Sequence, residues 1–512
     1  MHPLASSKRA RRVLMALAAI SGIFLTAGCG SGNPIIQSLG GGFSKSSLKG
    51  QYVISQTGIG IEQPQIGNAI APFSETIVFT ADGSGNLNVT VDDFDQVGGP
   101  YNLKSSVTGT YSIASDGTGS LNIGGSNGFN YAITMIDDKH FYIIEQDLFQ
   151  TASGFGEMQD KTAFTAAPSG PFIFKAHEVD TSSRVGGITI TAGAIAGTED
   201  FLSLGLLSTS QTVATSVSMT APDATNGWGK FTLTDGSSFN YYVVNSGKFY
   251  IMSNSPSGSL EIGQAEAQVA PAGGFSLATL PGSYVFGSSG DTTVTGSAGI
   301  HSAGVFTTDG NGHIESGSST VPGAVDYVQD TTVNSNLAVS GGTYTLDASG
   351  HGEIDLTLSV GTIKQKFWTL NGTRAYFLVN NTAAVEDGTF SQQQGAPFTA
   401  LSSQAAFVMD GFDVAFKDRV GLFKPTSGGF DWNQAANSFD PVQEIGSLTA
   451  TSTSGTYTVT SNGRAAVVVN GVTTSVVFYL SSANTGFMVQ EDTNSLGGVN
   501  DIGGSFTQQA SQ

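Results

Sequence analysis

The amino-acid sequence predicts an all-β protein made of four tandem antiparallel domains. Short stretches in which apolar and polar residues alternate recur along the chain, and Gly, Asp, Asn and Ser separate them, as between half-buried strands. Stretches with the helical spacing of apolar residues are almost absent. Clear strand candidates lie at residues 76–80, 87–91, 131–136, 141–144, 231–234 and 476–480.

A fourfold internal repeat gives the domain organisation, with roughly 110 residues in each copy. The copies open with the aromatic-led strands Tyr52–Ile54, Phe172–Phe174, Tyr284–Phe286 and Phe407–Met409. They close with a Gly followed five residues later by Gln, at Gly154/Gln159, Gly263/Gln268, Gly388/Gln393 and Gly504/Gln509. A Gly-Thr-Tyr marker lies between at 109–111, 342–344 and 455–457, and the second copy is degenerate there. The predicted β domains are 48–161, 169–269, 280–394 and 402–510.

Each copy fits a small eight-stranded up-and-down barrel, similar in architecture to lipocalins and avidins. In this arrangement the opening and closing strands of a copy are neighbours, which hides both sheet edges. Tyr131, Ile133 and Met135 would point inward. In the first copy the strands are expected near 51–57, 73–81, 86–94, 107–114, 119–124, 129–136, 140–146 and 154–160. A β-sandwich in each copy, or one large propeller, is the alternative.

Asp-Gly-x-Gly segments inside the copies predict hairpin turns, because Gly supplies a positive φ and Asp caps the turn with its side chain. They lie at 82–85, 116–119 and 309–312. Calcium loops need several oxygen ligands at alternate positions, whereas each of these turns offers one carboxylate. We therefore expect no metal site.

The N-terminus has the layout of a secretory signal peptide over residues 1–28: basic residues, a short apolar run and small residues. The segment Leu25–Cys29 resembles the lipobox of bacterial lipoproteins. The resemblance implies cleavage between Gly28 and Cys29 and lipid attachment to Cys29. Residues 29–47 would be a lipidated flexible tether. An Asp after the cysteine often retains members of that family in the inner membrane. Gly30 stands here instead and indicates the outer membrane.

Composition excludes several classes of protein. The net charge is −20, and no Lys/Arg cluster follows the signal segment, which argues against nucleic acid. Cys29 is the only cysteine, so the chain cannot form an internal disulfide.

No catalytic residue is assigned. The six histidines are scattered, without metal-ligand spacing. A Gly-x-Ser-x-Gly match at 124–128 precedes a predicted strand rather than the helix that such a nucleophile needs. Acidic pairs, such as Asp92-Asp93 and Glu386-Asp387, mostly adjoin turn residues and are expected in solvent. No cofactor is expected. Trp228 and Trp432 lie near turns and are candidate glycan contacts.

The sequence thus predicts a non-enzymatic, membrane-anchored lipoprotein that faces the surface or periplasm as a structural or adhesive repeat array. Its markers resemble a broad group of uncharacterised bacterial repeat lipoproteins, for which no activity is known. The alternative is binding of a small apolar ligand or a glycan by one or more barrels. A binding barrel needs an unfilled interior. The many large inward-facing residues favour filled ones.

Overall fold

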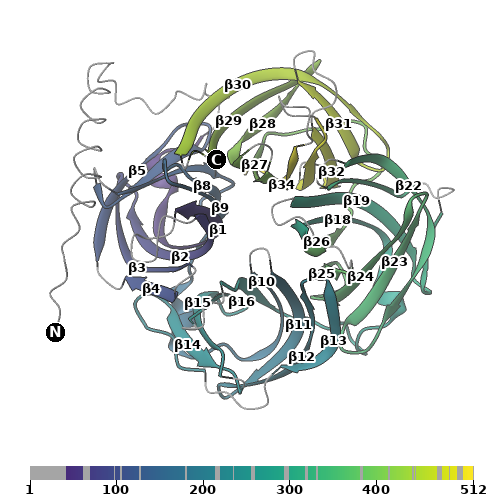
Figure 1. The fold of residues 1–512 in the computed structure, drawn as a ribbon, viewed down its shortest axis with the longest axis horizontal. Coiled ribbons are helices and arrows are strands. Elements are labelled where there is room, and N and C mark those ends of the chain that lie inside the picture. The colour runs from purple at the N-terminus through teal and green to yellow at the C-terminus, as the bar shows by residue number, and fades with distance from the viewer. Residues whose placement is uncertain are drawn as a thin grey trace. The chain divides into compact units, whose positions relative to one another are not determined.

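The structure, a computed structural model, places residues Ile36–Gln512 in one compact unit (Figure 1). The residues that it describes are 42–61, 70–96, 99–103, 106–125, 128–178, 181–213, 219–234, 236–254, 260–292, 299–316, 321–329, 332–380, 384–412, 415–440, 443, 445–469, 476–483, 485–492 and 500–510. The predicted signal segment with Gly28 and Cys29 lies outside them.

The described residues form four groups of antiparallel strands with three short 3-10 helices between or before them, which confirms the all-β prediction. Barrel 1 contains η1 (Lys45–Ser47), β1 (Lys49–Ile61), β2 (Ile70–Asp82), β3 (Asn86–Gln96), β4 (Gly99–Leu103), β5 (Val107–Ile113), β6 (Thr118–Ile123), β7 (Phe129–Met135), β8 (His140–Glu145) and β9 (Gln150–Met158). Barrel 2 contains η3 (Lys161–Thr165), β10 (Gly170–Glu178), β11 (Ser182–Thr191), β12 (Ala194–Ser203), β13 (Leu206–Val213), β14 (Trp228–Thr232), β15 (Ser238–Asn245), β16 (Lys248–Ser253) and β17 (Ile262–Ala267).

The second half of the chain repeats this order. Barrel 3 contains η4 (Leu277–Thr279), β18 (Pro281–Thr292), β19 (Gly299–Asp309), β20 (His313–Ile314), β21 (Ala324–Gln329), β22 (Thr332–Leu346), β23 (His351–Leu358), β24 (Gly361–Thr369), β25 (Arg374–Val379) and β26 (Ala384–Gln392). Barrel 4 contains β27 (Ala405–Phe412), β28 (Phe416–Thr426), β29 (Gly429–Asp440), β30 (Ile445–Val459), β31 (Arg464–Val469), β32 (Val476–Ser482), β33 (Thr485–Gln490) and β34 (Asp501–Gln508).

Three of the four sheets close into barrels in the described residues, rather than forming sandwiches or propeller blades. Barrels 1, 3 and 4 are closed by the pairs β2–β3, β18–β19 and β27–β28, whereas the described strands of barrel 2 leave β13 and β14 as the two ends of its sheet. In every copy the opening strand pairs with the closing strand, as predicted: β1 with β9, β10 with β17, β18 with β26 and β27 with β34.

The strands of the first copy lie within a few residues of their predicted places. The sequence missed β4, a short strand that extends one flank of barrel 1 by pairing with β3. It also misplaced the start of the fourth copy. The backbone N–H of Gln509 donates to the oxygen of Gln404, as that of Gln159 donates to Gln51, so Ala405 and not Phe407 is the equivalent of Tyr52.

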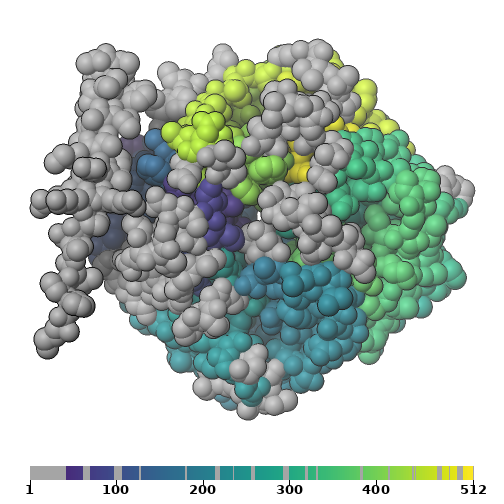
Figure 2. All heavy atoms as spheres, viewed as in Figure 1, coloured from purple at the N-terminus to yellow at the C-terminus, as the bar shows by residue number. Residues whose placement is uncertain are grey.

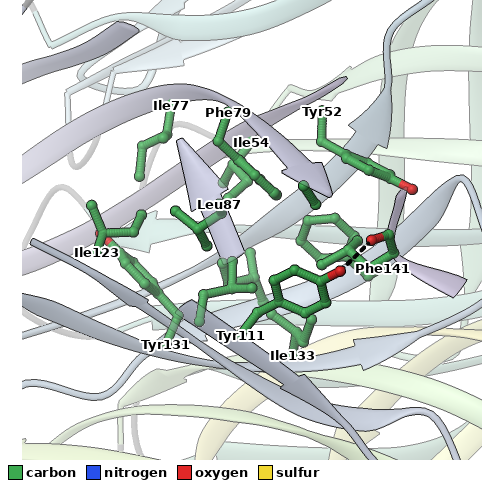
Figure 3. Packing of buried hydrophobic residues seen from close by; sticks show 14 of the residues in the cluster. Tyr52, Ile54, Ile77, Phe79, Leu87, Tyr111, Ile123, Tyr131, Ile133 and Phe141 are labelled. Atoms are coloured by element: carbon green, nitrogen blue, oxygen red, sulfur yellow. Dashed lines mark hydrogen bonds between the residues drawn. The ribbon is translucent and has the colours of Figure 1, made fainter. Parts of the chain in front are cut away.

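Large apolar side chains fill the barrels. In barrel 1, Tyr131, Ile133 and Met135 point inward as predicted and join a core around Tyr52 and Phe141 (Figure 3). The rings of Tyr52 and Phe141 lie 5.8 Å apart, centre to centre. Aromatic pairs of this kind contribute about 0.5–1.5 kcal/mol beyond their burial. Barrels 2, 3 and 4 have equivalent cores. Filled interiors agree with a structural role for each barrel.

The glutamine of each closing marker joins its barrel to the next one. Its side-chain amide donates to two backbone carbonyls of the following barrel at 2.6–3.1 Å. The donor–acceptor sets are Gln159 to Asn226 and Val243, Gln268 to Ser349 and Thr369, Gln393 to Asn462 and Leu480, and Gln509 to Asp116 and Met135. The last set joins barrel 4 back to barrel 1. The junctions therefore form a closed circle.

A glycine in the left-handed region makes room for each of these amides. An added Cβ at Gly117, where φ is +91°, would lie 2.6 Å from the Gln509 amide nitrogen and 3.0 Å from the ring of Phe43. Gly227, Gly350 and Gly463 hold the equivalent places and also have positive φ. Only glycine adopts this conformation at low cost and leaves the space open. The glycine, the glutamine and a phenylalanine from the preceding linker thus form one repeated junction.

Apolar contacts between strands support the four junctions. Valines of β1, β2 and β3 pack against Tyr242 and Tyr250 of barrel 2. Barrels 2 and 3, barrels 3 and 4, and barrels 4 and 1 share similar clusters. Figure 2 shows barrel 2 (teal) against barrel 3 (green), and barrel 3 against barrel 4 (yellow). All four interfaces use the same side of one barrel and the opposite side of the next, which is the head-to-tail arrangement that closes rings.

The described end of the predicted tether is not flexible. Phe43 is 5% exposed and packs in the core of barrel 1, where its N–H donates to the oxygen of Ser115. Residues Lys45–Ser47 form η1. The ordered part of barrel 1 thus begins before residue 48, and the rest of the segment 29–41 lies outside the described residues.

Replacing Gln509 by alanine tests ring closure. The Gln509→Ala change removes two buried hydrogen bonds to the carbonyls of Asp116 and Met135, of which Asp116 keeps only a long one from Gln404 Nε2 at 3.5 Å. We expect a loss of about 2–4 kcal/mol in the free energy of unfolding, together with faster amide exchange at the barrel 4–barrel 1 junction. Denaturant titration and hydrogen-exchange mass spectrometry measure both. Gln508→Ala, at the neighbouring exposed residue, is the matched control, and an equal loss there would contradict the assignment.

Candidate functional site

The first hairpins of the four barrels meet around a shared cavity of about 440 Å³. It lies toward the far ends of β1, β10, β18 and β27, away from the glutamine junctions at the starts of these strands. The residues that line it are Thr57, Gly58, Ile59, Ile70, Pro72, Thr151, Lys175, His177, Glu178, Ser183, Ser289, Gly290, Asp291, Gly299, His301, Val385, Asp387, Asp410, Gly411, Phe412, Phe416, Lys417 and Asp418. A volume of this size is within the range of small-molecule sites.

One strand position contributes a polar residue to the cavity from every barrel. At the start of each opening strand, one residue accepts a hydrogen bond from the backbone N–H of the junction glutamine of the same barrel. The position six residues after it holds Thr57, His177, Ser289 and Asp410. Side chains alternate along a strand, so these residues point away from the cores that hold Ile54, Phe174, Phe286 and Phe407. Superimposing the four opening strands would have shown a polar position with four different residues.

An ion pair joins barrels 2 and 3 at the cavity wall. Lys175 Nζ lies 2.6 Å from Asp387 Oδ1, and Ser183 Oγ donates to Asp387 Oδ2 at 2.8 Å. Burial alone would raise the pKa of Asp387, but the Lys175 ammonium, the charge of His177 and the hydrogen bond from Ser183 hold it below its usual value. Asp387 is therefore ionised and neutralised by Lys175.

Two further carboxyl groups lie together on barrel 4. Burial raises the pKa of Asp410 to about 6. Burial, together with the charge of Asp410, raises the pKa of Asp418 to about 8. Thr151 of barrel 1 donates a hydrogen bond to Asp418. Near neutral pH the two groups thus hold a proton that isolated carboxylates would release.

Two histidines that are far apart in the sequence meet at this cavity. His301 is only 4% exposed, and it has no hydrogen-bond partner for its ring among the described residues. Its ring lies against the backbone of Gly411 and Gly503 in barrel 4. Burial lowers the pKa of His301 to about 4 and also lowers that of His177. His301 is therefore a neutral imidazole whose ring nitrogens are available to a bound molecule.

A second, much smaller cavity of about 40 Å³ lies inside barrel 2. Phe174, Phe231 and Phe249 line it, and Arg184 at its rim pairs with Glu261 at 2.8 Å. This volume holds about one water molecule. It gives little support to ligand binding inside a barrel.

The two candidate glycan contacts lie in packed surroundings. Trp432 is 5% exposed in the core of barrel 4, with its ring centre 4.3 Å from that of Phe407, so it offers no face to a glycan. Trp228 is half-buried and packs into the cluster between barrels 1 and 2, with Lys230 Nζ 5.2 Å from its ring centre. Both residues serve packing.

Several acidic pairs lie in interfaces rather than in solvent, contrary to the sequence-based expectation. Asp93 on β3 accepts from Tyr242 and from Asn240, at 2.7 Å, in barrel 2. Asp200 on β12 lies 2.7 Å from His351 Nε2 of barrel 3. A sequence shows the turn beside such a pair but not the neighbouring barrel that covers it.

The remaining predicted features have plain local structures. Asp82 caps its hairpin through the N–H groups of Ser84 and Asn86, and these bonds, with that from the Asn86 side chain, lower its pKa to about 2. Among the described residues no group of three or more His, Cys, Asp or Glu side chains could hold a metal ion. No helix in this part of the chain is long and apolar enough to cross a membrane.

Comparison with known proteins adds little. No protein-family model and no curated protein matches the chain. Among solved structures, the chain is similar to a mutant of Transferrin Binding Protein B from Haemophilus parasuis Hp5, with 9% identity, coverage of 67% of this chain and 76% of the other, and a TM-score of 0.19. The chain is also similar to isotype 1 Transferrin binding protein B from serogroup B Neisseria meningitidis. The identity is 9%, the match covers 69% of this chain and 76% of the other, and the TM-score is 0.20. Likeness this distant assigns neither a partner nor a function.

The buried carboxyl groups predict an unusual dependence of stability on pH. The pKa values of Asp92, Glu386, Asp410 and Asp418 lie at about 6 to 8, above the 3.8–4.5 of exposed groups. The folded state therefore binds more protons, and stability is lost as pH rises from about 4 to about 8. We expect the free energy of unfolding to fall by at least ~2 kcal/mol between pH 5 and pH 8. Asp418→Asn should flatten this slope in denaturant titrations, whereas exposed Asp138→Asn should not.

Proposed function

We propose that the chain is an exported, lipid-anchored protein that binds a small ligand, without catalysis, in the central cavity between its four barrels. The observation that carries this proposal is His301, a buried side chain whose ring has no hydrogen-bond partner within the described residues, at the wall of a cavity large enough for a ligand. Buried polar groups in proteins are nearly always hydrogen-bonded, so we infer that a bound ligand supplies the hydrogen bond to His301.

The position of the cavity suits a protein held at its N-terminus. Phe43, close to the predicted tether, packs beside Gly117 and the Gln509 junction at one end of barrel 1. Thr57 lies eight residues along β1 from Lys49, which corresponds to roughly 25 Å of strand. The cavity residue Thr57 and the buried Phe43 thus lie toward opposite ends of barrel 1.

The contacts of the described histidines support a role without catalysis. His140, His313 and His351 are held by Asp137, Asp309 and Asp200, as part of turns and interfaces. In the described part of the chain, none of these three imidazoles is bonded to a hydroxyl group that it could activate as a nucleophile.

A structural or adhesive role is the second candidate. Leu148 and Phe149 of barrel 1 are 47% and 50% exposed, and they adjoin the start of β30, where the Gly446 N–H donates to the Leu148 oxygen at 2.5 Å. Ile445 and Leu448 extend the same apolar surface. Such a surface suits a protein partner.

Cys29→Ser tests the anchor. If Cys29 carries lipid, the wild-type chain should incorporate labelled palmitate and partition into the detergent phase, because two or more acyl chains hold a protein stably on a membrane. The variant should do neither and should be recovered in the aqueous phase after export. Thr26→Leu, which keeps the cysteine, is the control. Equal partitioning of Cys29→Ser and wild type would contradict lipid anchoring at this residue.

Native mass spectrometry of the full chain, purified gently in detergent, tests the cavity. We expect a discrete extra mass that is lost on denaturation. Thr57→Trp places a large ring in the cavity and should abolish that mass, whereas Thr57→Val, of similar size to threonine, should retain it. A bare polypeptide mass in the wild-type chain would speak against the cavity site and favour the adhesive candidate.

A further inference from the structure

We propose that the central cavity binds a small organic amine, held through its ammonium groups by carboxylates of barrel 4 and by His301. This inference rests on the proposed function of the cavity and names the chemical class of its ligand. Its side chains come from barrels 3 and 4, which pack against one another in the ring.

The charges on the cavity wall favour a cation. Five carboxyl groups but only two lysines line it. Of the lysines, Lys175 is neutralised by Asp387 at 2.6 Å. Asp410 and Asp418 lie beside one another on β27 and β28. The Lys175 ammonium attracts Asp410 from a distance, but no basic side chain among the described residues forms an ion pair with either carboxyl group. An anionic ligand would meet an excess of negative charge here, whereas an ammonium group would be attracted.

His301 points independently to a ligand that donates hydrogen bonds. It is 4% exposed, lines the cavity, and lacks a hydrogen-bond partner for its ring within the described residues. A neutral imidazole has one nitrogen that accepts and one that donates. An ammonium N–H can donate a hydrogen bond to the acceptor nitrogen of His301, and the carboxyl oxygens of Asp410 and Asp418 are further acceptors.

The pair of acidic residues gives such a ligand its binding energy. Burial raises the pKa of both Asp410 and Asp418, which means that ionising them in the empty cavity is costly. A nearby ammonium group offsets that cost, because opposite charges attract strongly where water is excluded. Phe412 and Phe416, with ring centres 5.1 Å apart, offer an apolar surface for the methylene groups of an alkylamine.

Other classes fit less well. A metal ion needs several ligands at short distance, and no such cluster exists in the described chain. A purely apolar ligand would offer no hydrogen-bond donor to His301 and no opposite charge to Asp410 and Asp418. Alkylamines combine the charge, the N–H donors and the apolar stem that this wall offers.

Calorimetric titration of the full chain in detergent with putrescine tests the class. Butanediol is its neutral isostere, and succinate is an acidic molecule of similar length. We expect putrescine to bind at least ~10-fold more tightly than either, and salt to weaken it. Asp410→Asn and, separately, Asp418→Asn should each reduce putrescine affinity ~10-fold or more while thermal unfolding shows a folded ring. Exposed Asp138→Asn should bind like wild type.

The outcomes separate this inference from the proposed function. If a native ligand mass is retained but putrescine binds no better than butanediol, or if both Asn variants bind it unchanged, the amine class is overturned and the cavity site stands. If no ligand mass is retained and none of the probes binds, both proposals fail.

Discussion

The fold depends on one repeated contact, the side-chain amide of a glutamine placed against two carbonyls of the next barrel. Gln159, Gln268, Gln393 and Gln509 each leave their own closing strand and enter the neighbouring barrel beside a glycine with positive φ. Each hydrogen bond contributes only about 1 kcal/mol, but it fixes direction as well as distance. Four copies of one directed contact turn four barrels into a closed circle.

The ring places charges where a single barrel would not hold them. Asp93, Asp200 and Asp326 lie on outer faces of barrels 1, 2 and 3, and each is 0–2% exposed because the next barrel covers it. Tyr242, His351 and Arg464 satisfy them from across the interface. Breaking such a buried pair leaves an uncompensated charge, which costs several kcal/mol. These polar pairs thus make each interface specific, whereas the apolar clusters contribute most of the buried hydrophobic contact between the barrels.

Local pattern was enough to predict the barrels. Alternating residues and Asp-Gly turns act over neighbours in the chain, so they indicated all eight strands that close barrel 1 to within a few residues, and the pairing of β1 with β9. The interfaces could not be predicted in this way. Trp432 lies near a turn and was a candidate glycan contact, but it packs against Phe407 from another strand. His177 and His301 looked scattered because their meeting depends on the ring and not on their spacing.

The differences among the copies gather where the ring gives them a common environment. The junction residues repeat because each must perform the same packing. The position of Thr57, His177, Ser289 and Asp410 faces no core and no interface carbonyl, so packing does not restrict its side chain to one kind. A ring of four identical chains would place four identical residues there. A single chain can place an imidazole in one barrel and a carboxyl group in another at this position, which makes the cavity wall asymmetric.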